Sequence, residues 1–90
     1  MITYDEAKRQ TNLIKHGLDL ADAWMVYNAP NKLTLESPRK GEARKLDIAL
    51  VKVMGVVLAL VYVERDEEVH AISFRRTSRI ERRLYAEKCN

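Results

Sequence analysis

The chain has 90 residues, of which 47% are hydrophobic and 32% are charged, a balance that excludes a disordered protein and fits one globular domain over residues 1–90. The longest apolar run, residues 53–63, falls short of the roughly 20 residues of a membrane-spanning helix, and the acidic N-terminus does not resemble a signal peptide. One cysteine, Cys89, excludes an intramolecular disulfide and a metal site built on cysteines. We therefore expect a cytoplasmic protein that is not bound to a membrane and that carries neither a metal nor another cofactor.

The first third of the chain predicts a short strand at residues 2–4 followed by two helices. Residues 5–17 show helical spacing, with Asp5 as the N-terminal cap and Gly17 as the left-handed residue after the last turn. A second helix is predicted to begin at Asp19. Its predicted apolar face consists of Leu20, Ala23, Trp24 and Tyr27.

From residue 33 onward the period of the apolar residues changes from helical to two, which is the period of β-strands. The predicted strands are residues 31–37, 44–53, 56–63 and 69–74, separated by turns at 38–42, 54–55 and 65–68. The strand 56–63 is apolar on both faces, so we expect it to be central and covered on both sides. Strict alternation in the last strand places His70, Ile72 and Phe74 on one face.

A last helix is predicted from Arg79 to about Glu87, because Ser78 and Glu81 have the Ser-x-x-Glu spacing of a capping box. The residues that this helix would offer to the sheet are Ile80, Leu84 and Tyr85. The resulting order is β-α-α-β-β-β-β-α. It predicts an α+β fold in which helices pack against an antiparallel meander.

Positive charge is concentrated at one end of the chain. Residues 70–90 contain six Lys and Arg against two Asp and Glu, whereas residues 1–69 contain ten against eleven. Five arginines occur within nine positions where the last strand meets the last helix: Arg75, Arg76, Arg79, Arg82 and Arg83. Such a cluster suits a surface that binds a polyanion, although a solvated helix face or a surface for an acidic partner has the same composition.

The cluster lies near residue types that metal-free RNA cleavage requires. That reaction needs a base for the ribose 2′-hydroxyl, an acid for the leaving oxygen, and cations around the phosphate. Arginine suits the last role because its planar fork matches two phosphate oxygens. Both histidines also have structural interpretations, since His16 complements a helix dipole and His70 fits a half-buried strand position.

Short motifs follow one another in an ordered combination over almost the whole chain. An acidic residue follows an aromatic one near the N-terminus, Glu64-Arg65 follows the apolar strand, and residues 71–85 form a strand and a helix rich in arginine. The other matching positions are Lys8, Asn12, residues 15–18, Glu42, Arg44, Ile72, Ser73, Arg75, Glu81, Arg82 and Tyr85. In this combination the sequence resembles the BrnT family of bacterial toxins from type II toxin–antitoxin modules.

The resemblance implies a RelE-like ribonuclease fold and metal-independent RNA cleavage that halts translation. It also implies neutralisation by a cognate antitoxin, a BrnA-like protein with a ribbon-helix-helix domain, which would cover the active face. Operator DNA would then be contacted only through the antitoxin complex.

On this basis Arg75 and Arg76 are predicted to contact the phosphate and to stabilise charge in the transition state. Glu64 or His70 is the predicted proton-transfer group, with His16 as a further candidate. Contacts to the RNA backbone are predicted for Lys15, His16, Arg44, Arg65, Arg79 and Tyr85. Two other hypotheses stay open: a nucleic-acid-binding module without catalysis, whose binding would depend on salt, and a module whose basic face holds a protein partner.

Overall fold

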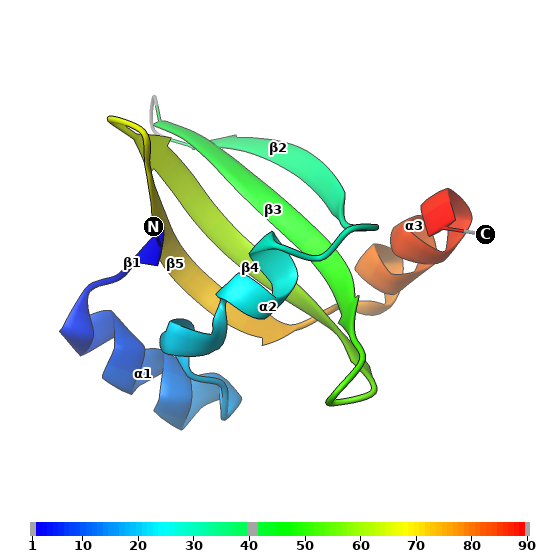
Figure 1. The fold of residues 1–90 in the computed structure, drawn as a ribbon, viewed down its shortest axis with the longest axis horizontal. Coiled ribbons are helices and arrows are strands. Elements are labelled where there is room, and N and C mark those ends of the chain that lie inside the picture. Colours follow the sequence, from blue (N-terminus) through cyan, green and yellow to red (C-terminus); the bar gives the residue numbers. More distant parts are fainter. Residues whose placement is uncertain (1, 40–41, 90) are drawn as a thin grey trace.

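The computed structural model describes residues 2–39 and 42–89 (Figure 1). The N-terminal part contains, in chain order, β1 (Ile2–Thr3), α1 (Glu6–His16), the 3₁₀ turn η1 (Leu20–Asp22) and α2 (Trp24–Tyr27). The remainder contains β2 (Leu33–Arg39), β3 (Glu42–Val51), β4 (Val56–Arg65), β5 (Glu68–Arg76) and α3 (Arg79–Cys89). The predicted element order and the α+β class are confirmed. No helix among the described residues has both the length and the apolar character needed to span a membrane.

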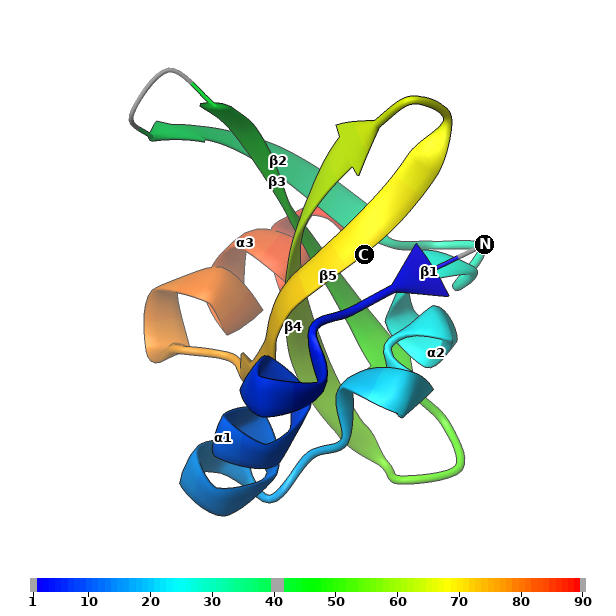
Figure 2. The ribbon, with the colours of Figure 1, turned by 90° about the vertical axis from the view of Figure 1, so that its left-hand side faces the viewer.

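The five strands form a single sheet in the order β1-β5-β4-β3-β2. Strands β2 to β5 pair antiparallel as the predicted meander, whereas β1 pairs parallel with β5, so the sheet is mixed. Figure 2 shows α2 and α3 on opposite sides of the sheet and α1 beside β5. The sheet is therefore the central layer, and each face has its own helix.

The side chains on the two faces of β4 pack against different parts of the molecule. Leu58, Leu60 and Tyr62 lie on the core face, where they pack with η1 and α2 in the main hydrophobic cluster. The alternate residues Ala59 and Val63 are also buried, but they lie on the opposite face, which carries α3 and is called the α3 face below. The prediction that this strand is central and covered on both sides is confirmed.

A β-bulge in β5 changes the side to which the later residues of this strand point. Ile72 is an extra residue between Ala71 and Ser73, which pair with consecutive residues of β4. Phe74 therefore lies on the core face and is buried, whereas His70 lies on the other face. The prediction that these side chains share one face was wrong, because an unpaired extra residue breaks strict alternation.

Side chains form hydrogen bonds with the backbone at both edges of the sheet, beyond the residues that pair with the edge strands β1 and β2. On α1, the Asn12 amide pairs with the Phe74 backbone as another strand would, with Oδ1 accepting from the N–H at 3.0 Å and Nδ2 donating to the C=O at 2.8 Å. Nδ2 also donates to the Leu18 carbonyl at 2.8 Å. At the opposite edge the Tyr85 hydroxyl accepts from the Leu50 N–H at 3.2 Å. These contacts fix α1 against β5 and α3 against β3.

The local signals for the helix ends and for the β4–β5 turn are confirmed, whereas the other two predicted turns differ in extent. The Asp5 carboxylate accepts from the Ala7 N–H at 2.8 Å, and Gly17 ends α1 with φ of 68°. Asp66 and Glu67 form the two-residue turn between β4 and β5, both with positive φ, as a type I′ hairpin turn requires. Of the predicted turn at residues 38–42, positions 38–39 and 42 belong to β2 and β3, and positions 40–41 lie outside the described residues. The β3–β4 turn spans residues 52–55, so the prediction that positions 52–53 continue the strand was wrong.

The predicted second helix is replaced by η1 and a single turn of α2. Leu20 and Ala23 are fully buried and three residues apart, which is the period of the 3₁₀ turn η1, and Val26 of α2 is buried with them. This period turns Trp24 outward, where it is 52% exposed. The prediction that Trp24 packs on the same face as Leu20 was wrong for this reason.

Helix α3 packs less closely than its sequence predicts. Ile80 and Leu84 are 68% and 38% exposed, and Tyr85 is the half-buried member of the predicted contact face. Besides the Tyr85 contact, the helix is held near its C-terminus by Lys88 Nζ, which donates to the Lys32 carbonyl at 3.1 Å. The prediction of an apolar interface built on Ile80 and Leu84 was therefore wrong.

Candidate nucleic-acid interface and active site

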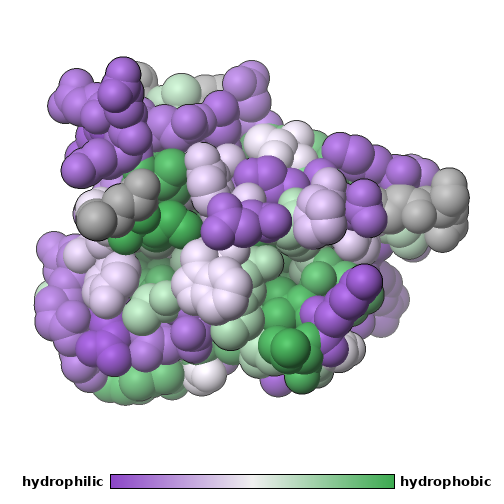
Figure 3. Space-filling view, in the orientation of Figure 1, coloured by the Kyte–Doolittle hydropathy of each residue, from purple (hydrophilic) through white to green (hydrophobic). Residues whose placement is uncertain are grey.

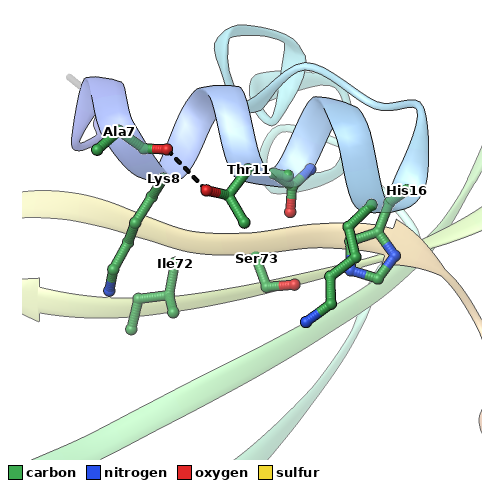
Figure 4. A pocket seen from close by; sticks show the side chains of 8 residues that line it. Ala7, Lys8, Thr11, His16, Ile72 and Ser73 are labelled. Atoms are coloured by element: carbon green, nitrogen blue, oxygen red, sulfur yellow. Dashed lines mark hydrogen bonds between the residues drawn. The ribbon is translucent and has the colours of Figure 1, made fainter.

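A groove lies on the α3 face between α1 and the start of α3. Its first part has Ile72 and Ser73 of β5 as the floor and a wall from α1 that consists of Ala7, Lys8, Thr11, Asn12, Lys15 and His16. The second part shares this floor and is lined further by Arg44, Leu46, Val61, Arg75 and Glu81. Because both parts share Ile72 and Ser73, they form one surface, called the cationic groove below. Figure 4 shows Lys8 and His16 extending from α1 towards this floor.

The floor exists because of the bulge in β5. In a regular strand two consecutive side chains point to opposite faces, so one of Ile72 and Ser73 would be turned away. The extra residue lets both line the groove, and bulges commonly re-aim side chains in this way beside functional sites. The Asn12 amide, paired with the backbone next to Ser73, then places α1 along the same stretch of strand.

Arg75 is held in the groove by a bidentate ion pair. Its Nη1 and Nη2 donate to Glu81 Oε1 and Oε2 at 2.8 and 3.0 Å, and the two side chains are only 28% and 15% exposed. The same carboxylate accepts from the Ser78 N–H at 2.8 Å, while the Glu81 N–H donates to Ser78 Oγ at 3.2 Å. The predicted capping box is confirmed, and its glutamate also orients the arginine.

This network shifts both ionisation equilibria. Hydrogen bonding by Arg75 lowers the pKa of Glu81, and hydrogen bonds from Ser78 lower it further. The Glu81 carboxylate in turn raises the pKa of Arg75. At neutral pH the groove therefore contains an ionised pair with a fixed geometry.

The groove is positively charged because its lysines and arginines outnumber its carboxylates. Lys8 and Lys15 come from α1, and Arg44 and Arg75 come from β3 and β5. Among the described residues that line the groove, Glu81 is the one acidic side chain. Cations on both sides of a strand floor suit a phosphate chain that runs along it.

The structure brings several of the predicted site residues together. Lys15, His16, Arg44 and Arg75 all line the cationic groove. His70 lies on the same face in one cross-strand row with Arg44, separated from it by Val63. Its Nδ1 is 3.0 Å from the Thr3 hydroxyl, which fixes the ring.

Other predicted residues lie elsewhere. Glu64 is on the core face at the opposite end of β4 from Arg75, and Lys45 Nζ donates to its carboxylate. That ion pair raises the pKa of Lys45. Arg76 lines a separate hollow with Thr77 and the β3–β4 hairpin. The remaining predicted contacts fall at the exposed end of β4 (Arg65), on the exposed start of α3 (Arg79) and against the Leu50 N–H (Tyr85).

Lys8, Ser73 and Glu81 match the family pattern in the sequence, but no site role was predicted for them. A signal for Lys8 was present, since positions 8, 11 and 15 recur at the spacing of one helix face. Ser73 carried no local signal, because its orientation depends on the bulge. Glu81 was recognised only as a cap, because its contact with Arg75 forms across the end of the strand.

A mixed sheet with a groove of lysines, arginines and a histidine is the arrangement expected of a small protein that binds a polyanionic chain. Comparison with protein families makes this specific: the model of the ribonuclease toxins, BrnT, of type II toxin–antitoxin systems matches residues 4–81. The chain belongs to this family. It is therefore a toxin of the ribonuclease kind, with RNA as its substrate and an antitoxin as its partner. No curated protein is similar enough to count as a relative.

Proposed function

We propose that the chain is an endoribonuclease that cleaves RNA in the cationic groove without a metal ion, and that it thereby halts translation in the cytoplasm. The observation that carries this proposal is the convergence of four cations and His16 on the floor formed by Ile72 and Ser73. This arrangement contains both the charge that holds a phosphate and a group able to move a proton.

In this proposal Arg75 stabilises the negative charge that grows on the phosphate in the transition state. Glu81 does not touch the RNA and acts as a positioning residue, since it fixes both terminal nitrogens of the guanidinium. A preorganised cation costs little reorganisation at the moment of reaction. Lys8, Lys15 and Arg44 hold the neighbouring backbone phosphates.

Proton transfer is assigned to His16 first, because it lines the groove, and to His70 second, because it lies on the same face near Arg44. Glu64 does not share this surface, since its side chain leaves the core face and pairs with Lys45. His16→Gln and His70→Gln variants separate the two assignments. We expect the variant of the true proton donor or acceptor to lose one limb of the pH–rate profile.

The decisive experiment incubates the purified chain with total RNA in EDTA, beside Arg75→Ala and Arg76→Ala variants. The two arginines are adjacent in sequence, but only Arg75 lines the groove, so Arg76→Ala is a matched control. We expect discrete fragments from the wild type and from Arg76→Ala, and intact RNA from Arg75→Ala. Cleavage that stops in EDTA and returns with Mg²⁺ would contradict the metal-free mechanism. Loss of cleavage in Arg76→Ala alone would place the active site at the hollow lined by Arg76 and not in the cationic groove.

We further propose that the antitoxin is a BrnA-like ribbon-helix-helix protein and that operator DNA is contacted only through the complex. Membership in the toxin family supports this assignment. Sequencing the gene that accompanies this chain, followed by co-purification of the two products, tests it directly.

A further inference from the structure

A second groove, outside the cationic groove, lies between α2 and the tip of the β3–β4 hairpin. Trp24 and Pro30 line one side, and Leu50, Lys52 and Val53 line the other. None of its lining residues also lines the cationic groove. Figure 3 shows apolar surface gathered over this hairpin, at the lower right of the view.

The exposure of these side chains is unusual for their types and positions. Trp24 is 52% exposed, Leu50 41% and Val53 85%, and Met54 beside them is 44% exposed. Hairpin tips are normally made of polar residues and glycine, but here Val53 and Met54 precede Gly55. A contiguous apolar patch of this kind marks an interaction site more often than an accident of packing.

The charges around the hairpin define the partner. Lys52 is the one charged residue among those that line the apolar groove. On the other side of the hairpin, Arg76 and Arg82 line a hollow together with Gly55 and Val57. Among the described residues that line these two surfaces there is no Asp or Glu. The complementary segment therefore has apolar side chains flanked by carboxylates.

A second copy of the chain fits this surface poorly. The chain has a net charge of +3, and a symmetric contact through the hairpin would bring two sets of Lys52, Arg76 and Arg82 together. Such like-charge contacts disfavour a partner. RNA matches the cations and can stack a base on Trp24, but it gains little from the aliphatic side chains of Leu50 and Val53. An acidic amphipathic segment of a protein matches the cations, the aromatic ring and the aliphatic side chains together.

We propose that the antitoxin docks here through an acidic amphipathic segment, with apolar side chains beside Trp24 and Val53 and carboxylates against Lys52, Arg76 and Arg82. This inference rests on the toxin–antitoxin part of the proposed function and does not require the chain to be catalytically active. It gives the antitoxin an anchor outside the RNA groove. The affinity of the toxin–antitoxin complex then depends on a surface that is not needed for RNA binding.

Trp24 is the only tryptophan of the chain, so its fluorescence reports on the groove. The probe is the purified antitoxin encoded beside this chain, and a Trp24→Phe variant allows emission from the antitoxin to be subtracted. We expect Trp24 emission to shift to the blue and to become less accessible to acrylamide when the antitoxin binds. An antitoxin that binds tightly while Trp24 emission and quenching stay unchanged overturns the proposal.

Substitutions at the hairpin give a second, independent test by calorimetric titration with the same antitoxin. Val53→Glu and Lys52→Glu should each weaken binding at least tenfold, while RNA cleavage without antitoxin stays at the wild-type rate. The matched control is Ile14→Glu, which places the same charge on an aliphatic residue that is 87% exposed on α1, away from the hairpin. Equal affinity of Val53→Glu and wild type contradicts the proposal.

Two further outcomes are distinguishable. A wild-type chain that forms a dimer in light scattering, and a Val53→Glu variant that is monomeric, would assign the groove to a second copy and overturn the inference. Antitoxin binding that depends on Val53 in a chain that leaves RNA intact would uphold the docking surface and reject the nuclease.

Discussion

The Glu81 side chain links the start of α3 to the centre of the cationic groove. One oxygen serves both the Ser78 N–H and Arg75 Nη1, and the other receives Arg75 Nη2. A capping residue usually acts only on its own helix, which it stabilises by about 1 kcal/mol. Here the same residue also fixes the cation proposed to meet the scissile phosphate, so a substitution affects two properties that experiment can separate.

We predict that Glu81→Gln binds RNA more tightly and cleaves it about tenfold more slowly than the wild type. Removing a negative charge beside the phosphate strengthens binding, whereas losing the ion pair leaves the Arg75 fork less well oriented. Single-turnover cleavage and binding of a 2′-O-methyl RNA measure the two effects. The control Ser78→Ala removes the cap but keeps the ion pair, so it should cost about 1 kcal/mol of stability and leave the cleavage rate unchanged. An unaltered rate in Glu81→Gln would remove the positioning role.

The same network predicts a pH dependence of stability. The pKa of Glu81 in the folded chain lies below its ordinary value of 4.5. A lowered pKa means that the stabilisation is present above the ordinary value and is lost as the pH falls through the folded value. The difference in unfolding free energy between wild type and Glu81→Gln should therefore shrink as the pH is lowered from 7 to 3, as urea titrations at each pH would show. A constant difference would mean that the ion pair does not contribute.

At the level of elements, α1 is placed by one side chain more than by apolar packing. The buried residue of this helix is Asn12, whose amide continues the edge of β5 beyond the end of β1. The Lys8 and His16 side chains lie one turn on either side of it, on the wall of the groove. The position of the groove wall thus depends on the pairing of an amide with a backbone.

We predict that Asn12→Ala lowers the unfolding free energy by about 2–3 kcal/mol, because it leaves the buried Phe74 N–H and C=O without their partner. Urea unfolding measures the loss. The control is Gln10→Ala on the same helix, where an exposed hydrogen bond to Glu6 is removed and the change should stay within about 0.5 kcal/mol. Equal stability of the two variants would show that the amide is not an anchor.

At the scale of the whole molecule, two surfaces with different chemistry occupy different parts of the fold. The cationic groove lies along β5 between α1 and α3, and the apolar groove lies at the far end of the β3–β4 hairpin beside α2. The first suits phosphates and the second suits a protein segment. RNA binding should therefore depend on salt through the cations of the cationic groove, whereas the apolar contacts of the second surface are not screened by salt.

We predict that the affinity for single-stranded RNA falls with salt with a logarithmic slope of about −3, since four groove cations each displace a fraction of a counterion. Lys8→Ala should reduce the slope by about 0.7, and Lys52→Ala, outside the groove, should leave it unchanged. Fluorescence anisotropy at several salt concentrations measures these slopes with a 2′-O-methyl RNA. A slope near zero would mean that the groove does not hold the backbone.

Much of the local structure could be predicted from the sequence, because the signals lie within a few residues of what they control. Asp5 and Gly17 bound α1, and Ser78 with Glu81 begins α3, each through contacts spanning at most four positions. The change of period after residue 33 located the strands for the same reason. The arginine cluster and the order of the motifs also indicated the family, because these properties belong to the chain itself.

Which side chains of the sheet are buried was decided by the tertiary structure. Asp47 stands between Leu46 and Ile48 in the sequence, a position typical of an outward polar residue in an alternating strand. In the structure it is fully buried and accepts from Lys32, Thr34 and Tyr62. Alternation shows which residues share a face, but it does not show whether that face is covered. Coverage depends on which helix packs there.

The candidate site followed the same division. The sequence determined that Arg75 would stand where a basic strand meets a helix. Only the fold decided that Ser73 lines the groove beside Arg75 and that Glu81 binds the Arg75 guanidinium. The fold also decided that Glu64 lies on the opposite face of the sheet. The reason is physical: one extra residue in β5, set by its register against β4, turns the later side chains over, and register is a property of two strands that no single stretch of sequence contains.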